Sequence, residues 1–133
     1  MRNRTRTAIF SILLGLACVL SFAGSAMAGT YFEATLPAWQ GRGWCAGANK
    51  TAGSTTYYVE LSSSSPNGGH FWVDDDSGTY IGAGIDLERG EYTWGAYVNA
   101  HARAYGGYAT LYGRAIGNGP ISDYVTGWYD LNG

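Results

Sequence analysis

The 133-residue sequence is poor in cysteine, proline and positive charge. It has two cysteines, three prolines and eight Lys or Arg residues, against ten acidic residues. Its only lysine is Lys50. Non-specific binding to DNA, RNA or anionic lipid requires clustered positive charge, so this composition excludes those partners.

The first 28 residues have the pattern of an export signal. Three arginines within the first six residues precede an apolar run at 8–23, and an Ala-Met-Ala triplet ends at Ala28. No second apolar run follows, so we expect no transmembrane segment in the mature chain and a secreted, extracellular product, Gly29–Gly133, that forms one domain. This part keeps five basic and ten acidic residues, a net charge of −5.

Removal of the signal leaves Cys45 as the only cysteine, so no internal disulfide is possible and the fold depends on its core. We interpret Cys45 as a small buried hydrophobic residue. Two alternatives remain open: an intermolecular disulfide or labile thiol, and a nucleophile paired with His70 or His101 in a small secreted hydrolase.

Short alternating runs of Tyr, Val, Thr and Trp recur between clusters of Gly, Ser, Asn and Asp, and no long run has helical spacing. This pattern predicts an all-β fold, an antiparallel two-sheet β-sandwich of about seven strands, with a small barrel as the alternative. The predicted strands are Tyr31–Leu36, Ser54–Ser62, His70–Asp75, Thr79–Leu87, Glu91–Tyr105, Tyr108–Gly117 and Ser122–Asp130.

Two hairpins are predicted from turn signals. Gly106-Gly107 separates two alternating runs and predicts a two-residue turn, which would place Tyr105 opposite Tyr108. The inner side of this ribbon would carry Trp94 and several alanines against Ala109 to Ala115. A second turn at Asp76-Ser77-Gly78 fits either a two-residue loop or a three-residue loop with Gly78 in the left-handed region.

The run Asp74-Asp75-Asp76 resembles a calcium loop only poorly, because the glycine and glutamate that such a loop needs further on are absent. We interpret it as a solvated acidic turn that hydrogen-bonds its own backbone. We therefore expect no metal and no cofactor.

The outer side of the predicted ribbon mixes tyrosine with polar side chains, which is typical of binding surfaces. Tyrosine and threonine are also ordinary residues of a solvated strand, so a purely structural role is the alternative. As a ligand-binding surface, this face would suit an anionic or hydroxyl-rich target. Its residues are Tyr97, Asn99, His101, Arg103, Tyr105, Tyr108, Thr110, Tyr112 and Arg114.

Spaced aromatic and glycine motifs give the chain a family likeness. These motifs are Lys50-Thr51, Tyr57 to Leu61, Phe71-Trp72-Val73, Leu111 to Arg114 and Gly127 to Asp130. Together with the export signal, they resemble small secreted β-proteins of Gram-positive bacteria, some of which are bacteriocins of the lactococcin 972 type. The dense Tyr- and His-rich opening of lactococcin 972 itself is missing. The resemblance implies wall-directed or antimicrobial binding and assigns no functional residue.

Together these observations predict a secreted, non-enzymatic binding protein, in one form a bacteriocin-like inhibitor. Its expected target is a cell-wall glycan or a lipid-linked wall precursor that carries phosphate. The alternative is a self-assembling structural or surface protein, because Gly- and Tyr-rich strands of low charge can pair edge to edge. A small secreted hydrolase is the third possibility.

Overall fold

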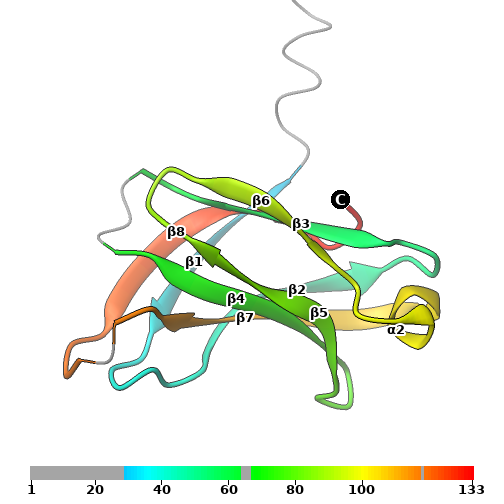
Figure 1. Ribbon diagram of the computed structural model, residues 1–133, viewed down its shortest axis with the longest axis horizontal. Helices are drawn as coiled ribbons and strands as arrows, with labels where there is room; N and C mark the ends of the chain where they lie inside the picture. Colours follow the sequence, from blue (N-terminus) through cyan, green and yellow to red (C-terminus); the bar gives the residue numbers. More distant parts are fainter. Residues whose placement is uncertain (1–28, 64–66, 118) are drawn as a thin grey trace, which may run out of the picture.

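The computed structural model describes residues 29–63, 67–117 and 119–133, and these form two antiparallel four-stranded sheets packed face to face (Figure 1). The predicted two-sheet β-sandwich is therefore confirmed. The predicted export signal, residues 1–28, lies outside the described residues. The strands are β1 (Thr30–Leu36), β2 (Gly43–Lys50), β3 (Thr56–Leu61), β4 (Gly69–Asp75), β5 (Tyr80–Leu87), β6 (Tyr92–Ala96), β7 (Gly107–Ala115) and β8 (Asp123–Asp130).

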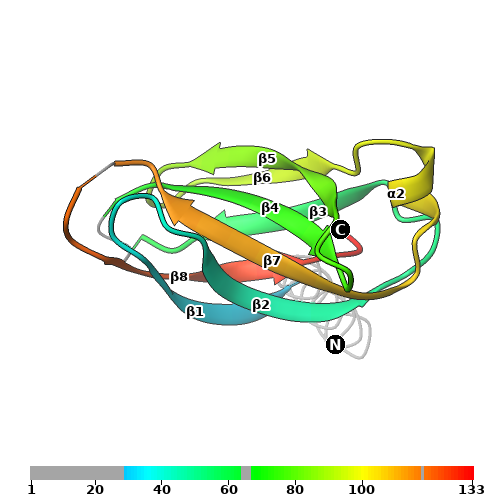
Figure 2. The same cartoon turned by 90° about the horizontal axis from the view of Figure 1, so that it is seen from below.

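The strand order is β1-β8-β3-β6 in the first sheet and β2-β7-β4-β5 in the second sheet. The second sheet lies in front when the molecule is seen from below (Figure 2). At the two long sides of the sandwich, β1 runs beside β2 and β5 beside β6 (Figures 1 and 2). A single bridge, Gly82 to Tyr97, links β5 to the segment after β6. The edges of the two sheets therefore approach each other, as in a flattened barrel.

The core lies between the sheets and follows the period-2 alternation of the strands. Tyr57, Val59 and Leu61 of β3 are fully buried, and so are Ala109 and Leu111 of β7, as predicted. The ring of Tyr57 lies over Gly82 and Gly95, where a Cβ atom would collide with it. Glycine in these two strands thus makes room for a large aromatic residue at the centre of the core.

Strand β2 is missing from the sequence prediction, and it raises the number of strands to eight. Its sequence, GWCAGANK, has no β-branched residue and two glycines, so it carries little strand propensity. It pairs along most of β7, from Gly43 opposite Gly113 to Lys50 opposite Gly107, with a bulge after Trp44. Tertiary pairing, not propensity, makes this segment a strand.

The predicted strand Glu91–Tyr105 is wrong beyond Ala96. Residues Ala100–Ala104 form a short helix, α2, and Asn99 caps it by accepting a hydrogen bond from the Ala102 N–H at 2.8 Å. Asparagine is among the best N-cap residues and alanine is the best helix former, so local preference overrides the apparent alternation.

The predicted hairpin at Gly106-Gly107 is therefore also wrong. Tyr108 pairs with Asn49 of β2 instead of Tyr105, and the Gly pair only leads from α2 into β7. Trp94, predicted to be in the core, is 54% exposed on the outer side of β6.

The second predicted hairpin, between β4 and β5, is present with a three-residue loop. Gly78 has φ +83°, in the left-handed region that favours glycine. Asp75 accepts hydrogen bonds from the N–H groups of Ser77 and Thr79, both at 2.9 Å. Hydrogen bonds from Ser77 first, and then from the backbone, lower the pKa of Asp75. The interpretation as a self-bonded acidic turn therefore holds for Asp75, whereas it is wrong for Asp74, which is buried and pairs with Arg42.

Lys50, the only lysine, is 2% exposed at the end of β2. Its Nζ donates to the carbonyls of Thr51, Arg103 and Tyr105 at 3.2, 2.9 and 3.0 Å. It also lies 4.4 Å from the centre of the Tyr97 ring. The ammonium group is thus fully engaged and holds the end of α2 against the second sheet.

Candidate functional site

The nine residues of the predicted binding face do not share one surface, because the ribbon that was to carry them is not formed. Tyr97 is 1% exposed, and its hydroxyl donates to the Leu131 carbonyl at 2.6 Å inside the core. Asn99 is the cap of α2. Both side chains therefore have structural roles.

The next residues of the predicted face lie around α2, at one end of the molecule. His101 and Arg103 are exposed on the helix. The Tyr105 hydroxyl donates to the Tyr108 carbonyl at 2.7 Å, and Tyr108 covers Gly47 of β2. Thr110, the next outward residue of β7, is buried.

Tyr112 and Arg114 lie further along the outer face of the second sheet, on the same side of β7 as Tyr108. Tyr112 pairs with Trp44 of β2 on one side and with Trp72 of β4 on the other. Arg114 pairs with His70 of β4. Directly paired residues project on the same side of a sheet, so an aromatic row lies beside a polar row.

The rings of this surface form a ladder across the strands. Trp72 stacks on Tyr112, with ring centres 6.0 Å apart and an interplanar angle of 25°. The Arg42 guanidinium lies 4.4 Å from the centre of the Tyr112 ring, and His70 lies 5.8 Å from Trp72 at the other end. We call this surface the arginine face; it consists of Arg42, Trp44, His70, Trp72, Tyr112 and Arg114.

The polar row is fixed by a hydrogen bond. His70 Nδ1 lies 2.6 Å from an Asp86 carboxylate oxygen on β5. The Nε2 side of the imidazole lies against Gly84, where a Cβ atom would be 2.5 Å away. The ring is therefore held in place from both sides.

A hollow of about 170 Å³ opens beside this imidazole, lined by His70, Trp72, Tyr80 and Arg114. Within the described residues Arg114 makes no ion pair, so its donors are available to a ligand. An aromatic wall and a cation thus border the same hollow.

The guanidinium group of Arg42 also forms an ion pair with Asp74, whose carboxylate oxygen lies 3.5 Å from it. Asp74 is buried, and this burial raises the pKa of its carboxyl, while Arg42 acts in the opposite direction. The guanidinium is thereby oriented between a carboxylate and a ring, and such stacking leaves its remaining donors directed outward.

The Cys-His pairing considered for a hydrolase is not formed. Cys45 is 2% exposed and faces the core, whereas His70 projects from the opposite side of the same sheet and His101 lies on α2. Burial raises the pKa of the Cys45 thiol to about 12, so the reactive thiolate is disfavoured. The interpretation of Cys45 as a buried hydrophobic residue is confirmed.

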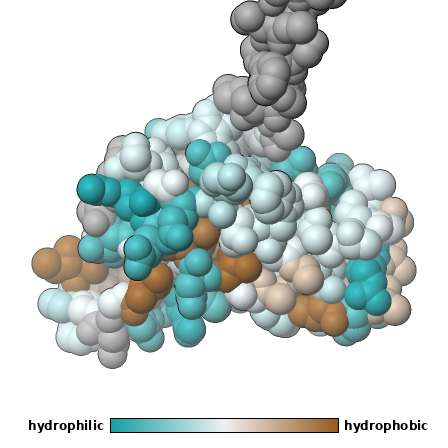
Figure 3. Space-filling model, turned by 45° about the horizontal axis from the view of Figure 1, so that its top comes forward, coloured by the Kyte–Doolittle hydropathy of each residue, from teal (hydrophilic) through white to brown (hydrophobic). Residues whose placement is uncertain are grey.

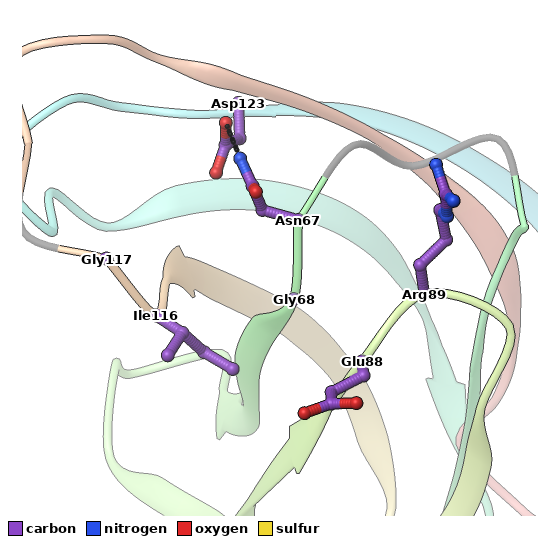
Figure 4. A pocket seen from close by; sticks show the side chains of 7 residues that line it. All are labelled: Asn67, Gly68, Glu88, Arg89, Ile116, Gly117 and Asp123. Atoms are coloured by element: carbon purple, nitrogen blue, oxygen red, sulfur yellow. Dashed lines mark hydrogen bonds between the residues drawn. The ribbon is translucent and has the colours of Figure 1, made fainter.

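A larger cleft, of about 540 Å³, lies at the loop end of the sandwich (Figure 4). Asn67 donates to the Asp123 carboxylate at 2.9 Å across one side of it, while Glu88 and Arg89 point in different directions on the other (Figure 4). Its lining has both signs of charge and no aromatic ring. It lacks the combination of rings and cations that marks the arginine face.

Sequence reasoning missed Arg42 and Trp44 because it assigned no strand to Gly43–Lys50. His70 and Trp72 were placed in a strand, and their alternation with buried Phe71 and Val73 indicates that they face outward. Their meeting with Tyr112 depends on the pairing of β4 with β7, which no local signal reveals.

No family model matches this chain, and no curated protein is significantly similar to it in sequence.

Proposed function

We propose that this is a secreted, non-enzymatic protein that binds an anionic cell-wall glycan across its arginine face. The proposal moves the expected binding surface from the predicted ribbon to the second sheet. Of the residues predicted for the ribbon, it retains Tyr112 and Arg114. A bacteriocin-like inhibitor would be one biological form of such a protein.

The observation that carries the proposal is the juxtaposition of the ring ladder with unpaired positive charge. Trp44 is 57% exposed at one end of the aromatic row. Sugar rings have apolar C–H faces, and a flat exposed indole offers them a large area at low entropic cost. Arg114 stands next to this row and can donate several hydrogen bonds to a carboxylate or phosphate substituent.

The shape of the surface favours a polymer over a small enclosed ligand. Pockets for small molecules usually measure about 300–1,000 Å³. The hollow at Arg114 has about 170 Å³ and is shallow. It would seat one substituent or one sugar unit, while the rest of the chain lies along the row that crosses β2, β7 and β4.

The His70–Asp86 pair supports a positioning role better than a catalytic one. A general base needs its free nitrogen directed at a substrate or nucleophile. Here Nδ1 is bound by Asp86 and Nε2 lies over Gly84 in β5. The pair therefore orients a flat polar ring beside Trp72.

Co-sedimentation of the purified protein with isolated bacterial cell wall tests the proposal. We expect retention on wall material that falls as salt rises, because anionic ligands are screened. Trp44→Ala combined with Arg114→Gln should reduce retention at least tenfold. Trp94→Ala, on the opposite sheet, is the matched control and should leave it unchanged.

A second experiment uses cell wall from which the anionic polymers have been removed chemically. Retention should drop on the stripped wall and be restored when the isolated polymer is added back to the matrix. Equal retention of the wild type and the double variant would refute the proposal, provided both have the same melting temperature.

A further inference from the structure

The outer face of the first sheet differs from the arginine face in its charges. Its strands β1, β8, β3 and β6 contain no Lys, Arg or His, whereas they contain four carboxylates. In the second sheet, the strands carry Asp74, Asp75 and Asp86 but also His70 and Arg114 on the outer side, besides the buried Lys50. The cations of the strands are thus confined to one side of the sandwich.

Six aromatic rings cover the first sheet's outer face, and several are half exposed or more, among them Tyr92 at 59% and Trp94 at 54%. We call this surface the glutamate face. Much of the surface that comes forward in Figure 3 is pale, of intermediate hydropathy, as expected for tyrosine, tryptophan and threonine. The glutamate face consists of Tyr31, Glu33, Tyr58, Glu60, Tyr92, Trp94, Tyr124 and Trp128.

Tyr58, Tyr92 and Trp94 form a cluster of three rings. Their centres are 5.2, 5.8 and 6.1 Å apart, and their planes are inclined at 41° to 85° to one another. On the same face, toward the β1 edge of the sheet, the Tyr31 ring packs edge-on against the Trp128 ring, with ring centres 5.4 Å apart. The electron-rich faces of these rings therefore point in several directions above one sheet.

Each glutamate of this face is coupled to a tyrosine two residues before it. The Tyr58 hydroxyl donates to Glu60 at 2.7 Å, and the Tyr31 hydroxyl donates to Glu33 at 3.1 Å. Partial burial, together with the bond to Glu60, raises the pKa of Tyr58 to about 12. A phenol that donates to a carboxylate becomes more electron-rich, which strengthens the attraction of its ring for a cation.

From this arrangement we infer that the glutamate face docks a basic peptide segment through its arginine side chains. The expected partner is positively charged, because the four described strands of this face offer carboxylates and ring faces and contain no Lys, Arg or His. A guanidinium group uses both at once, since it pairs with a carboxylate through two parallel N–H groups and stacks on an aromatic plane.

The spacing of the two Tyr-Glu pairs sets the spacing of the arginines. Glu33 pairs with Thr126, and Glu60 pairs with Trp128 two residues further along the intervening strand β8. The two glutamates are separated by two strand spacings of about 4.8 Å and by two residues with a rise of about 3.4 Å each. The Cα atoms of Glu33 and Glu60 are therefore about 12 Å apart. An extended peptide covers this distance in three to four residues, so the sites match arginines separated by two or three residues.

Fluorescence anisotropy with labelled peptides tests this inference on the purified protein. The probe carries two arginines separated by three glycines, and its control carries the neutral isostere citrulline at both positions. We expect the arginine peptide to bind at least tenfold more tightly at low salt. Equal binding of the citrulline peptide would overturn the inference.

Variants locate the site. Glu33→Gln with Glu60→Gln removes charge but keeps shape, and should weaken binding at least tenfold, as should Trp94→Ser. Arg114→Gln, on the arginine face, is the control and should not change it. If the glutamine variant retained full affinity with an unchanged melting temperature, the peptide would bind elsewhere and the inference would fail.

A neutral oligosaccharide completes the experiment as a competitor. If the oligosaccharide displaced the peptide and bound the glutamine variant equally well, the aromatic rings would be a sugar-binding site, and the basic peptide would be excluded as the partner. Peptide binding does not depend on wall binding, so loss of either activity leaves the other measurable.

Discussion

The two outer faces of this sandwich are built alike and charged differently. Each has aromatic residues paired directly across neighbouring strands, but the polar side chains lie in the next row on the arginine face, whereas Glu60 lies between Tyr92 and Trp128 on the glutamate face. On the arginine face the rings stack in a ladder that ends at Arg42, whereas on the glutamate face they are inclined to one another and the Tyr31 and Tyr58 hydroxyls donate to glutamates. One architecture thus supports two kinds of recognition.

The difference shows that a solvated sheet face can be specialised by a few side chains while the core stays common. Aliphatic residues and buried rings such as Phe32, Tyr57 and Phe71 fill the inner positions, while exposed rings and polar side chains occupy the outer ones. The charge of the residues between the rings then decides which ligand each face suits.

The largest effect is expected from the shared core, where one change should disable both faces. Phe71 is fully buried, and its ring meets Phe32 of the first sheet edge-on at 6.3 Å. Phe71→Ala should lower the free energy of unfolding by about 3–5 kcal/mol, because it leaves a cavity between the sheets. Urea denaturation measures this loss.

The adjacent residue supplies the control for that experiment. Trp72→Ala removes a larger ring from the outer side of the same strand, and it should cost much less stability because part of the ring is already in water. It should affect wall binding alone. A similar loss of stability in both variants would contradict the division between core and face.

Lys50 shows that not every cation of the second sheet belongs to its outer face. Lys50→Met keeps the length of the side chain but leaves the Arg103 and Tyr105 carbonyls without their donor. We expect a loss of about 1–3 kcal/mol in unfolding free energy, with both binding activities retained below the melting temperature. Arg103→Met, at an exposed position on α2, should stay within about 0.5 kcal/mol of the wild type.

Alkaline pH separates the buried tyrosines from the exposed ones. Burial raises the pKa of Tyr57 and of Tyr97 above the ordinary value of 10. The stability contributed by their neutral forms is present below pH 10 and is lost as the pH rises above 10 toward the folded-state pKa, since the unfolded chain ionises first.

Each buried tyrosine should therefore lower the unfolding free energy by about 1.4 kcal/mol per pH unit in this range. Tyr97→Phe removes one such group, so its stability should fall less steeply with pH between 10 and 11. Urea unfolding at several pH values gives the two slopes. Parallel slopes for the variant and the wild type would contradict the role of Tyr97.

These comparisons rest on elements that the sequence predicts unequally. The strands Thr56–Leu61 and Gly69–Asp75, which alternate β-branched and aromatic residues, were predicted to within two residues at either end. The three-residue turn that ends in Gly78 was one of the two turns predicted there. Here local propensity, burial pattern and turn chemistry agree.

Two elements could not be predicted in this way. Gly43–Lys50 becomes a strand only through its pairing with β7, and Ala100–Ala104 becomes a helix through an N-cap within an alternating run. These two errors together displaced the candidate site, because Tyr112 pairs with Trp44 of β2 and not with the predicted strand Glu91–Tyr105. A cap residue followed by three alternate alanines was the available signal for the helix.

The smallest effect is expected at Arg42, and it tests how the arginine face is built. Arg42 is mostly exposed, and the glutamine amide can still donate to the buried Asp74, so Arg42→Gln should change the unfolding free energy by about 1 kcal/mol. Wall binding should nevertheless fall several-fold, because the variant loses a cation that the Tyr112 ring and Asp74 hold in a fixed orientation. Co-sedimentation beside urea denaturation separates the two effects, and Arg103→Gln is the charge-matched control away from the face. If both variants lost wall binding equally, net charge alone would explain retention, and the ordered ladder of Arg42, Tyr112 and Trp72 would have no part in recognition.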